Sequence, residues 1–137
     1  MSAAAPFSRT YPADPASVAA IRAAVGAYAS QIGAARSTVD AVKLAVSEAA
    51  TNVVIHAYRD MDVRGLIDVE ARITEGELCV SVADAGPGLR PRVDSPGLGF
   101  GLAIVTQLAD AVELLQGGEG GLRVVMRFAL PASATGV

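Results

Sequence analysis

Two polar residues, Glu48 and Asn52, stand four positions apart in a stretch whose apolar residues recur at helical spacing, so both side chains should share one helix face. Their neighbours on that face, at about 100° per residue, are mostly apolar. Apolar surroundings raise the pKa of a carboxylate and suit it to act as a general base. Carboxylate and amide oxygens are also the ligands that hard cations prefer. Taken alone, the pair fits equally well a Glu and an Asn that are covered and satisfied by a loop.

Asp84 directly follows an apolar segment, and glycines stand two and four positions later, at Gly86 and Gly88. We expect a strand that ends at this aspartate, so that its carboxylate faces a loop whose glycines let a ligand approach the backbone. A carboxylate in such a pocket accepts a hydrogen bond from an exocyclic amine, such as that of adenine. A plain turn closed by the aspartate side chain is the alternative, and this short motif alone is weak support for either.

A second glycine segment precedes an expected helix. It reads Gly97-Leu98-Gly99-Phe100-Gly101-Leu102. Backbone N–H groups in a glycine-rich turn at a helix N-terminus favour anions, so the segment has the character of a phosphate cradle. The apolar residues between the glycines indicate anchoring rather than a flexible linker. A dinucleotide-binding βαβ unit fits poorly, because it needs such a loop after a first strand and an acidic residue after a second.

The remaining pattern predicts the elements that hold these residues. Strands are expected at Phe7–Tyr11, Leu66–Ile73, Glu77–Ala83, Val112–Gln116 and Leu122–Leu130, and helices at Ala16–Ile32, Ser37–Tyr58 and Leu102–Ala109. Asp14 and Pro15 should begin the first helix, and Ser37 should cap the second. The residues from 84 to 101 are expected to form a loop. Paired strands predict an α/β two-layer sandwich, with a mixed, mostly antiparallel sheet and helices on one face.

The second helix is expected to have an apolar stripe and a solvent-exposed face. The stripe contains Val39, Val42, Val46, Ala49, Ala50, Val53 and Ala57, and the exposed face contains Asp40, Lys43, Ser47 and Thr51. His56, near the end of this helix, is interpreted as a structural residue that bonds the last carbonyls, and Tyr58 as a packing residue.

Composition excludes several kinds of site. The 137 residues fit one domain, 1–137, with an ordered core expected at about 7–131. One cysteine and one histidine exclude a disulfide and a cysteine-rich or histidine-rich zinc site. The only lysine, Lys43, follows no glycine, so no Walker A loop is present. A net charge of −3 without a basic run argues against nucleic acid as a partner. The absence of a long apolar run or signal sequence predicts a cytoplasmic protein without a membrane partner.

The three motifs in this order resemble the N, G1 and G2 boxes of the GHKL (Bergerat-fold) ATPase superfamily, which includes histidine kinases and gyrase-type topoisomerases. The N box is Glu48-x-x-x-Asn52, and the resemblance extends over residues 40–130. Within that group the chain is most similar to the anti-sigma-factor serine/threonine kinases, because its N box continues into His56-Ala57-Tyr58. The segment between the second and third motifs, Leu89–Pro96, is as short as the lid of those kinases.

The resemblance implies ATP and Mg²⁺ as ligands. The nucleotide would be bound by Asn52, Asp84, Gly86, Gly88, Gly97, Leu98, Gly99, Phe100, Gly101 and Leu102. Asn52 would ligate the magnesium ion that bridges the phosphates, and Glu48 would be the catalytic base. Asp84 would accept the adenine amine. One position departs from the family pattern, since Leu122 stands where many relatives have a threonine that supports adenine binding. Either Thr106 or a water compensates for this change, or nucleotide affinity is lowered.

The resemblance also implies a function. The chain is expected to be a kinase that phosphorylates a serine or threonine of an anti-sigma-factor antagonist, sequesters a sigma factor and forms a homodimer. Arg90 and Arg92, in the short lid, are candidates for contacting phosphate or docking the antagonist, and the alternative is that they are solvated surface charges. The alternative is a nucleotide-binding partner-switch module that transfers no phosphate.

Overall fold

The computed structural model describes residues 5–58, 65–86, 98–116 and 121–132, with residues 98–101 described by their backbone alone. The strands are β1 (Phe7–Pro12), β2 (Leu66–Thr74), β3 (Glu77–Ala83), β4 (Ala111–Gln116) and β5 (Leu122–Ala129). The helices are α1 (Pro15–Gln31), α2 (Arg36–Asn52) and α3 (Leu98–Leu108), and the π-helical turn η1 (Val53–Ala57) continues from α2. No helix in these described ranges is both long enough and apolar enough to cross a membrane.

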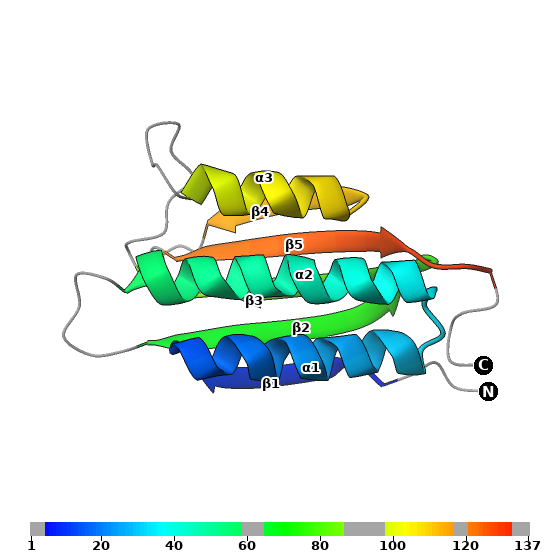
Figure 1. Cartoon of the computed structure of the whole chain (residues 1–137), viewed down its shortest axis with the longest axis horizontal. Helices are drawn as coiled ribbons and strands as arrows, with labels where there is room; N and C mark the ends of the chain where they lie inside the picture. Colours follow the sequence, from blue (N-terminus) through cyan, green and yellow to red (C-terminus); the bar gives the residue numbers. More distant parts are fainter. Residues whose placement is uncertain (1–4, 59–64, 87–97, 117–120, 133–137) are drawn as a thin grey trace.

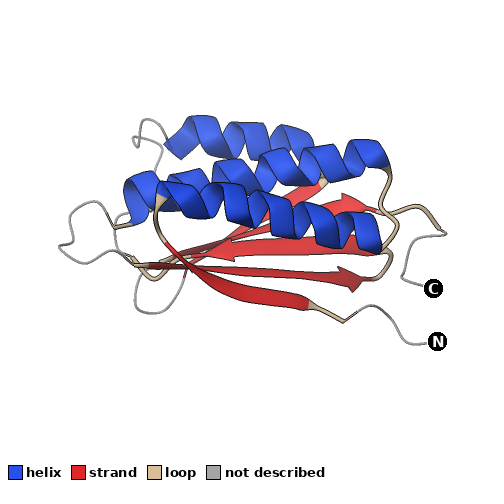
Figure 2. Ribbon diagram, turned by 60° about the horizontal axis from the view of Figure 1, so that its bottom comes forward, coloured by secondary structure: helices blue, strands red, loops and turns tan. Residues whose placement is uncertain are grey.

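The five strands form one sheet in the order β1-β2-β3-β5-β4 (Figure 1). The four neighbouring pairs are all antiparallel, so the sheet contains no parallel pair among the described strands, and the "mixed" part of the prediction was wrong. The helices cover a single face of this sheet and leave the other face open (Figure 2). The predicted two-layer α/β sandwich is therefore confirmed.

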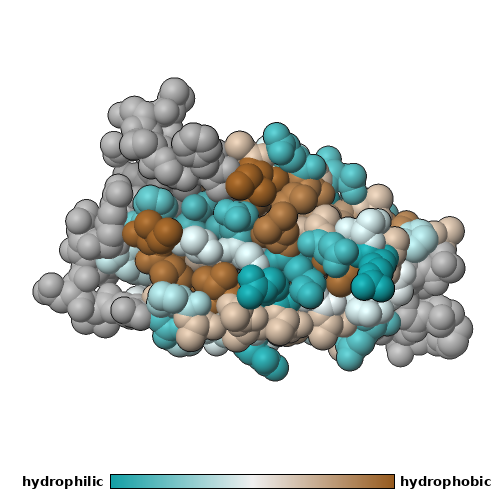
Figure 3. Space-filling view, in the orientation of Figure 1, coloured by the Kyte–Doolittle hydropathy of each residue, from teal (hydrophilic) through white to brown (hydrophobic). Residues whose placement is uncertain are grey.

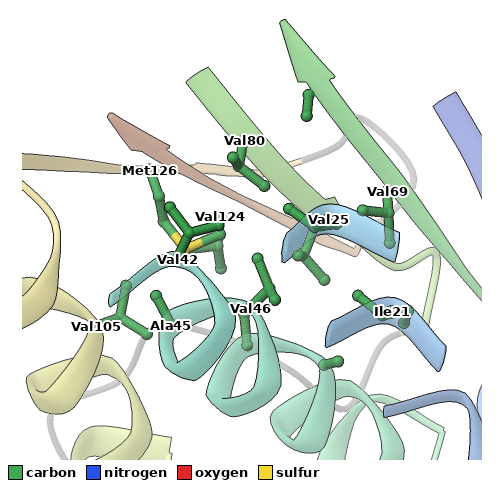
Figure 4. Packing of buried hydrophobic residues seen from close by; sticks show 14 of the residues in the cluster. Ile21, Val25, Val42, Ala45, Val46, Val69, Val80, Val105, Val124 and Met126 are labelled. Atoms are coloured by element: carbon green, nitrogen blue, oxygen red, sulfur yellow. The ribbon is translucent and has the colours of Figure 1, made fainter. Parts of the chain in front are cut away.

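Strand register places alternate residues of the sheet under the helices. Val69 of β2 pairs with Val82 of β3, which in turn pairs with Val124 of β5, so one apolar row crosses three strands. The helices pack small aliphatic side chains against such rows: Ile21 and Val25 from α1, Val42, Ala45 and Val46 from α2, and Val105 from α3 (Figure 4). Because the core contains so few aromatic residues, its packing depends on close approach of the two layers.

The ends of α1 follow the predicted rules. The Asp14 carboxylate accepts a hydrogen bond from the Ser17 backbone N–H at 3.1 Å, and Pro15 occupies the first helical position. Gly33, with a φ of 88°, stands just after the helix, where the left-handed conformation suits glycine. The predicted N-cap of α2 was wrong, because the N-cap residue is Ala35, which has no side-chain hydrogen bond, and Ser37 lies inside the helix.

The second helix differs from the prediction in its exposed face and its end. Ser47 is buried, because α1 packs on this side; its hydroxyl donates to the Lys43 carbonyl oxygen at 2.7 Å. Lys43 lies across Gly26 of α1, where a Cβ would come within 2.7 Å of the lysine Cγ. The α-helix ends at Asn52 instead of Tyr58 and passes into η1. The side chains after Asn52 therefore do not continue the α-helical line that the spacing predicted.

The third helix begins four residues earlier than predicted. It starts at Leu98 instead of Leu102, so the predicted loop of residues 84–101 ends before the second and third glycines of its last motif. Residues 87–97 lie outside the described residues. The five predicted strands are confirmed. Between β2 and β3, Glu75 and Gly76 both have positive φ, as a tight hairpin requires.

Candidate nucleotide-binding site

The described segments that carry the predicted site residues meet at one end of the two layers. Here α2 ends and continues into η1, β3 ends before Asp84, and α3 and β5 begin (Figure 1). Backbone contacts tie these segments together: the Asp84 N–H donates to the Leu122 carbonyl oxygen at 3.0 Å, and Gly86 lies against the Ala57 carbonyl. Three motifs far apart in the sequence thus come to the same edge.

Asp84 is the most distinctive group at this edge. Its Oδ1 accepts a hydrogen bond from the Gly86 N–H at 2.8 Å, whereas its Oδ2 is buried without a hydrogen-bond partner among the described residues. Burial raises the pKa of this carboxyl from 3.8 to about 6, although hydrogen bonds with the Gly86 and Leu122 backbone oppose the rise. A buried acceptor without a donor is costly, so the site is suited to a ligand that brings an N–H group to Oδ2.

Two glycines hold the Asp84 turn against its surroundings. A Cβ on Gly86 would overlap the carbonyl oxygen of Ala57 in η1, and a Cβ on Gly121 would overlap the carbonyl oxygen of Asp84. Gly121 also has a φ of +84°, which side-chain-bearing residues adopt rarely. The turn is therefore clamped between η1 and the start of β5, and both close contacts require glycine.

Asn52 and Glu48 lie on α2, one turn apart. Asn52 is 6% exposed, and its Nδ2 has no hydrogen-bond partner among the described residues, so the side-chain amide is buried but unsatisfied. Glu48 is partly buried. The π-helical turn starts directly after Asn52, and such turns frequently occur at functional sites. His56 also lies in this turn and is partly buried.

The structure describes only part of the last predicted motif. Gly88 and Gly97 lie outside the described residues, as do the lid Leu89–Pro96 and its Arg90 and Arg92. The backbone of Leu98, Gly99, Phe100 and Gly101 forms the first turn of α3, where N–H groups have no partner within the helix. Leu102 is partly buried and packs against the core.

The residue that departs from the family pattern, Leu122, belongs to the hydrophobic core. Leu122 is 2% exposed, and it serves Asp84 through its backbone carbonyl oxygen instead of a side-chain hydroxyl. Thr106 is exposed, and its hydroxyl donates to the Ala103 carbonyl oxygen of its own helix at 2.8 Å. Thr106 therefore does not offer the replacement that the sequence suggested.

The sequence did not single out Tyr58, Gly65 or Gly121 as site residues. The Tyr58 hydroxyl accepts a hydrogen bond from the Ala85 N–H and donates one to the Leu66 carbonyl oxygen, both at 2.9 Å. The motif His56-Ala57-Tyr58 includes Tyr58, but a packing role was the simpler interpretation of this residue. Nothing in the sequence indicated which glycines the turn presses against.

Two further observations restrict where a ligand binds. The described residues contain no group of three or more His, Cys, Asp or Glu side chains that is able to hold a metal ion by itself. A shallow hollow of about 660 Å³ lies on the open face of the sheet, but none of the predicted site residues lines it. Two of its three arginines form ion pairs, Arg123 with Glu70 at 3.5 Å and Arg127 with Glu113 at 3.6 Å. We therefore place the candidate site at the Asp84 edge.

Comparison with known proteins identifies the family. Residues 11–128 match the family model described as the histidine kinase-like ATPase domain. The chain belongs to this family. Its similarity to anti-sigma F factors confirms the resemblance drawn from the motifs: it is 31% identical over 119 residues to that of Clostridium beijerinckii, a match that covers 77% of this chain and 81% of the relative. The corresponding protein of Clostridium acetobutylicum is 30% identical over 124 residues, which cover 80% and 84% of the two chains.

Two solved structures are also similar to the chain. The RsbU and RsbW domains of a Mycobacterium tuberculosis protein match 98% of this chain with a TM-score of 0.75 and 27% identity. The histidine kinase domain of a blue-light-activated kinase from Erythrobacter litoralis EL346 matches 69% of it with a TM-score of 0.57 and 31% identity. The present chain spans 35% of the first structure and 45% of the second.

Replacement of Gly121 tests whether the clamp shapes the site. Gly121→Ala introduces both a left-handed alanine and an overlap with the Asp84 carbonyl, so we expect it to displace Asp84 and weaken adenine-nucleotide binding at least tenfold. Gly76→Ala is the matched control, because Gly76 also has a positive φ (+78°) but open space around it. Both variants should lose about 1 kcal/mol of stability through backbone strain, and only the first should lose binding in calorimetry. Equal affinities of the two variants would contradict the clamp.

The raised pKa of Asp84 predicts how stability depends on pH. Between about pH 4 and pH 6 the folded protein keeps a proton on Asp84 that the unfolded chain has released, so the free energy of unfolding should fall as pH rises through this window. Because Asp84 is only partly buried, solvent screening reduces the size of this effect, and the direction of the change is the prediction. Urea titrations of the ligand-free protein should therefore show a fall that Asp84→Asn abolishes and that Asp40→Asn, on the exposed part of α2, retains. An unchanged slope in Asp84→Asn would exclude Asp84 as its source.

Proposed function

We propose that the chain is an ATP-dependent serine/threonine kinase that acts as an anti-sigma regulatory factor. In this proposal it phosphorylates an anti-sigma-factor antagonist and sequesters a sigma factor. The family supplies a kinase-like ATPase domain, and two relatives near 30% identity are named anti-sigma F factors. The observation that carries the proposal is the buried Oδ2 of Asp84, which has no hydrogen-bond partner among the described residues.

Asp84 would select adenine. Its Oδ2 is a buried acceptor without a hydrogen-bond donor among the described residues, and the exocyclic amine of adenine is a suitable donor. Guanine has a carbonyl oxygen at the corresponding ring position, which the carboxylate would repel. Because an ionised Asp84 is the better acceptor, adenine binding should strengthen as pH rises through about 6.

Asn52 and the first turn of α3 would hold the phosphates. The Asn52 amide oxygen is a suitable ligand for Mg²⁺. The Nδ2 of the same amide is buried without a partner among the described residues, so it would donate a hydrogen bond to a phosphate oxygen of the bound nucleotide. When bound, the ion would neutralise charge on the phosphate oxygens. The free N–H groups at the start of α3 favour an anion. Because the described residues provide no carboxylate cluster, we expect the metal to arrive together with the nucleotide.

Glu48 would be the general base. It lies one turn before Asn52, partly buried, and so borders the place where the phosphates would lie. In the proposed transfer the Glu48 carboxylate takes the proton of a serine or threonine hydroxyl as the hydroxyl oxygen forms a bond to the γ-phosphorus. The bond from this phosphorus to the β–γ bridging oxygen breaks, and ADP leaves.

Binding of the proposed partners and formation of the proposed homodimer both require exposed surface, either on the helix side or on the open face of the sheet. On the helix side, Leu44 of α2, Ile55 of η1 and Ile104 of α3 are exposed apolar side chains. Apolar groups lie among hydrophilic ones across this face (Figure 3). On the other side, the open face of the sheet carries paired arginines and glutamates. We propose a cytoplasmic location, as the partners of a sigma-factor regulator require.

Phosphate transfer from labelled ATP to a purified candidate antagonist tests the proposed chemistry. Glu48→Gln should retain ATP affinity within about twofold and lose transfer by at least 100-fold, because a general base acts in the transition state. Asp40→Asn, an exposed carboxylate on the same helix, should transfer at the wild-type rate. Asn52→Ala should lose both binding and transfer.

The outcomes separate the two candidate functions. Transfer by Glu48→Gln at the normal rate would remove Glu48 as the base. If the wild-type protein binds ATP and its partner but transfers no phosphate, the chain is a nucleotide-binding partner-switch module instead of a kinase.

A further inference from the structure

Tyr58 joins three segments of the candidate site through a single hydroxyl group. It follows η1 directly, its hydroxyl donates to the Leu66 carbonyl oxygen at the start of β2, and the same hydroxyl accepts from the Ala85 N–H after β3. Both bonds measure 2.9 Å. One side chain therefore connects the end of the helix that carries Glu48 and Asn52 with the turn that carries Asp84.

The bond to Ala85 controls the peptide next to Asp84. Ala85 lies between Asp84 and Gly86, and the Gly86 N–H holds the Oδ1 of Asp84 at 2.8 Å. The Tyr58 hydroxyl thus anchors the middle of a turn whose two ends fix the carboxylate. With Oδ1 held in this way, Oδ2 is the atom that remains without a partner. Loss of the anchor would let the turn rotate and let Oδ2 reach water.

The surrounding backbone is shaped to admit the tyrosine ring. A Cβ on Gly65 would overlap the ring carbons, and a Cβ on Gly86 would come within 2.8 Å of Cδ1. Two glycines from different segments therefore leave the space that the ring fills. A partly buried ring that two backbones approach this closely is restricted in its rotation, so its hydroxyl is a well-placed anchor.

We propose that Tyr58 is the positioning residue of Asp84. Its hydroxyl holds the Ala85 peptide so that Oδ2 stays turned toward the adenine position, and it couples this position to the helix that would hold the phosphates. The inference rests on the proposed nucleotide-binding function. It adds a residue that contacts neither the base nor the phosphates but fixes the orientation of the Asp84 carboxylate, which accepts the hydrogen bond from the base.

The variant Tyr58→Phe tests the inference, because it keeps the ring and removes only the hydroxyl. We expect its dissociation constant for ATP to rise about fivefold to tenfold, the effect of one lost hydrogen bond on a positioned group. Tyr28→Phe is the matched control. The Tyr28 hydroxyl is also buried, lies on α1 and has no hydrogen-bond partner among the described residues, so its removal should leave ATP affinity unchanged.

A second readout separates positioning from general destabilisation. Carboxyl NMR titration of the ligand-free, folded protein should give Asp84 a pKa near 6 in the wild type and in Tyr28→Phe. In Tyr58→Phe the pKa should fall toward its ordinary value, because a released turn admits water to Oδ2. A variant that was only less stable would keep the wild-type titration in its folded molecules.

Each result decides between the inference and the function on which it rests. Wild-type ATP affinity in Tyr58→Phe overturns the inference alone, and so does a loss of affinity with an unchanged Asp84 titration. A wild-type protein that binds no adenine nucleotide overturns the proposed function together with this inference.

Discussion

The buried carboxylate of Asp84 is the constraint around which the site is organised. One oxygen is satisfied by the Gly86 N–H, and the other is withheld from water without a protein donor. Folding pays for this desolvation, as the pKa of about 6 indicates. The glycines at 86 and 121, the Leu122 carbonyl and the Tyr58 hydroxyl all contact the same short turn. Their shared effect is to keep a costly group in one orientation, which is what preorganisation of a binding site requires.

The two-layer fold brings this carboxylate to the end of α2. Antiparallel pairing in the order β1-β2-β3-β5-β4 places β3 in the centre of the sheet, so Asp84 emerges between β2 and β5 and beneath the helices. The helix above it ends at Asn52, and the π-helical turn leads from there to Tyr58. Phosphate binding is thus proposed at Asn52, where this turn begins, and base recognition at Asp84, whose own turn the Tyr58 hydroxyl contacts. The general base is proposed to be Glu48, one helical turn before Asn52. The family match and the RsbW-type neighbour fit this arrangement.

Local rules predicted much of this arrangement. Alternation and turn residues located the strands, Asp14 and Pro15 located the start of α1, and the motif order identified the family. The errors came from tertiary packing. Ser47 reads as a polar surface residue, yet α1 covers it. The helix after Asn52 widens into a π-turn although its sequence continues an α-helical pattern. No local pattern predicted the glycines that pack against the Asp84 turn or the hydrogen-bond partners of the Tyr58 hydroxyl. Both depend on contacts between segments that are distant in the sequence.

The central claim is that Asp84 makes this site a receptor for adenine. Isothermal titration calorimetry of the wild-type protein and Asp84→Asn with ATP and with GTP, in the presence of Mg²⁺ at pH 8, tests it most directly. We predict that the wild type binds ATP and strongly prefers it to GTP, and that Asp84→Asn weakens ATP binding by about 1.5–3 kcal/mol, the contribution of a hydrogen bond to a charged group. Equal affinities of the wild-type protein for ATP and GTP would contradict the account.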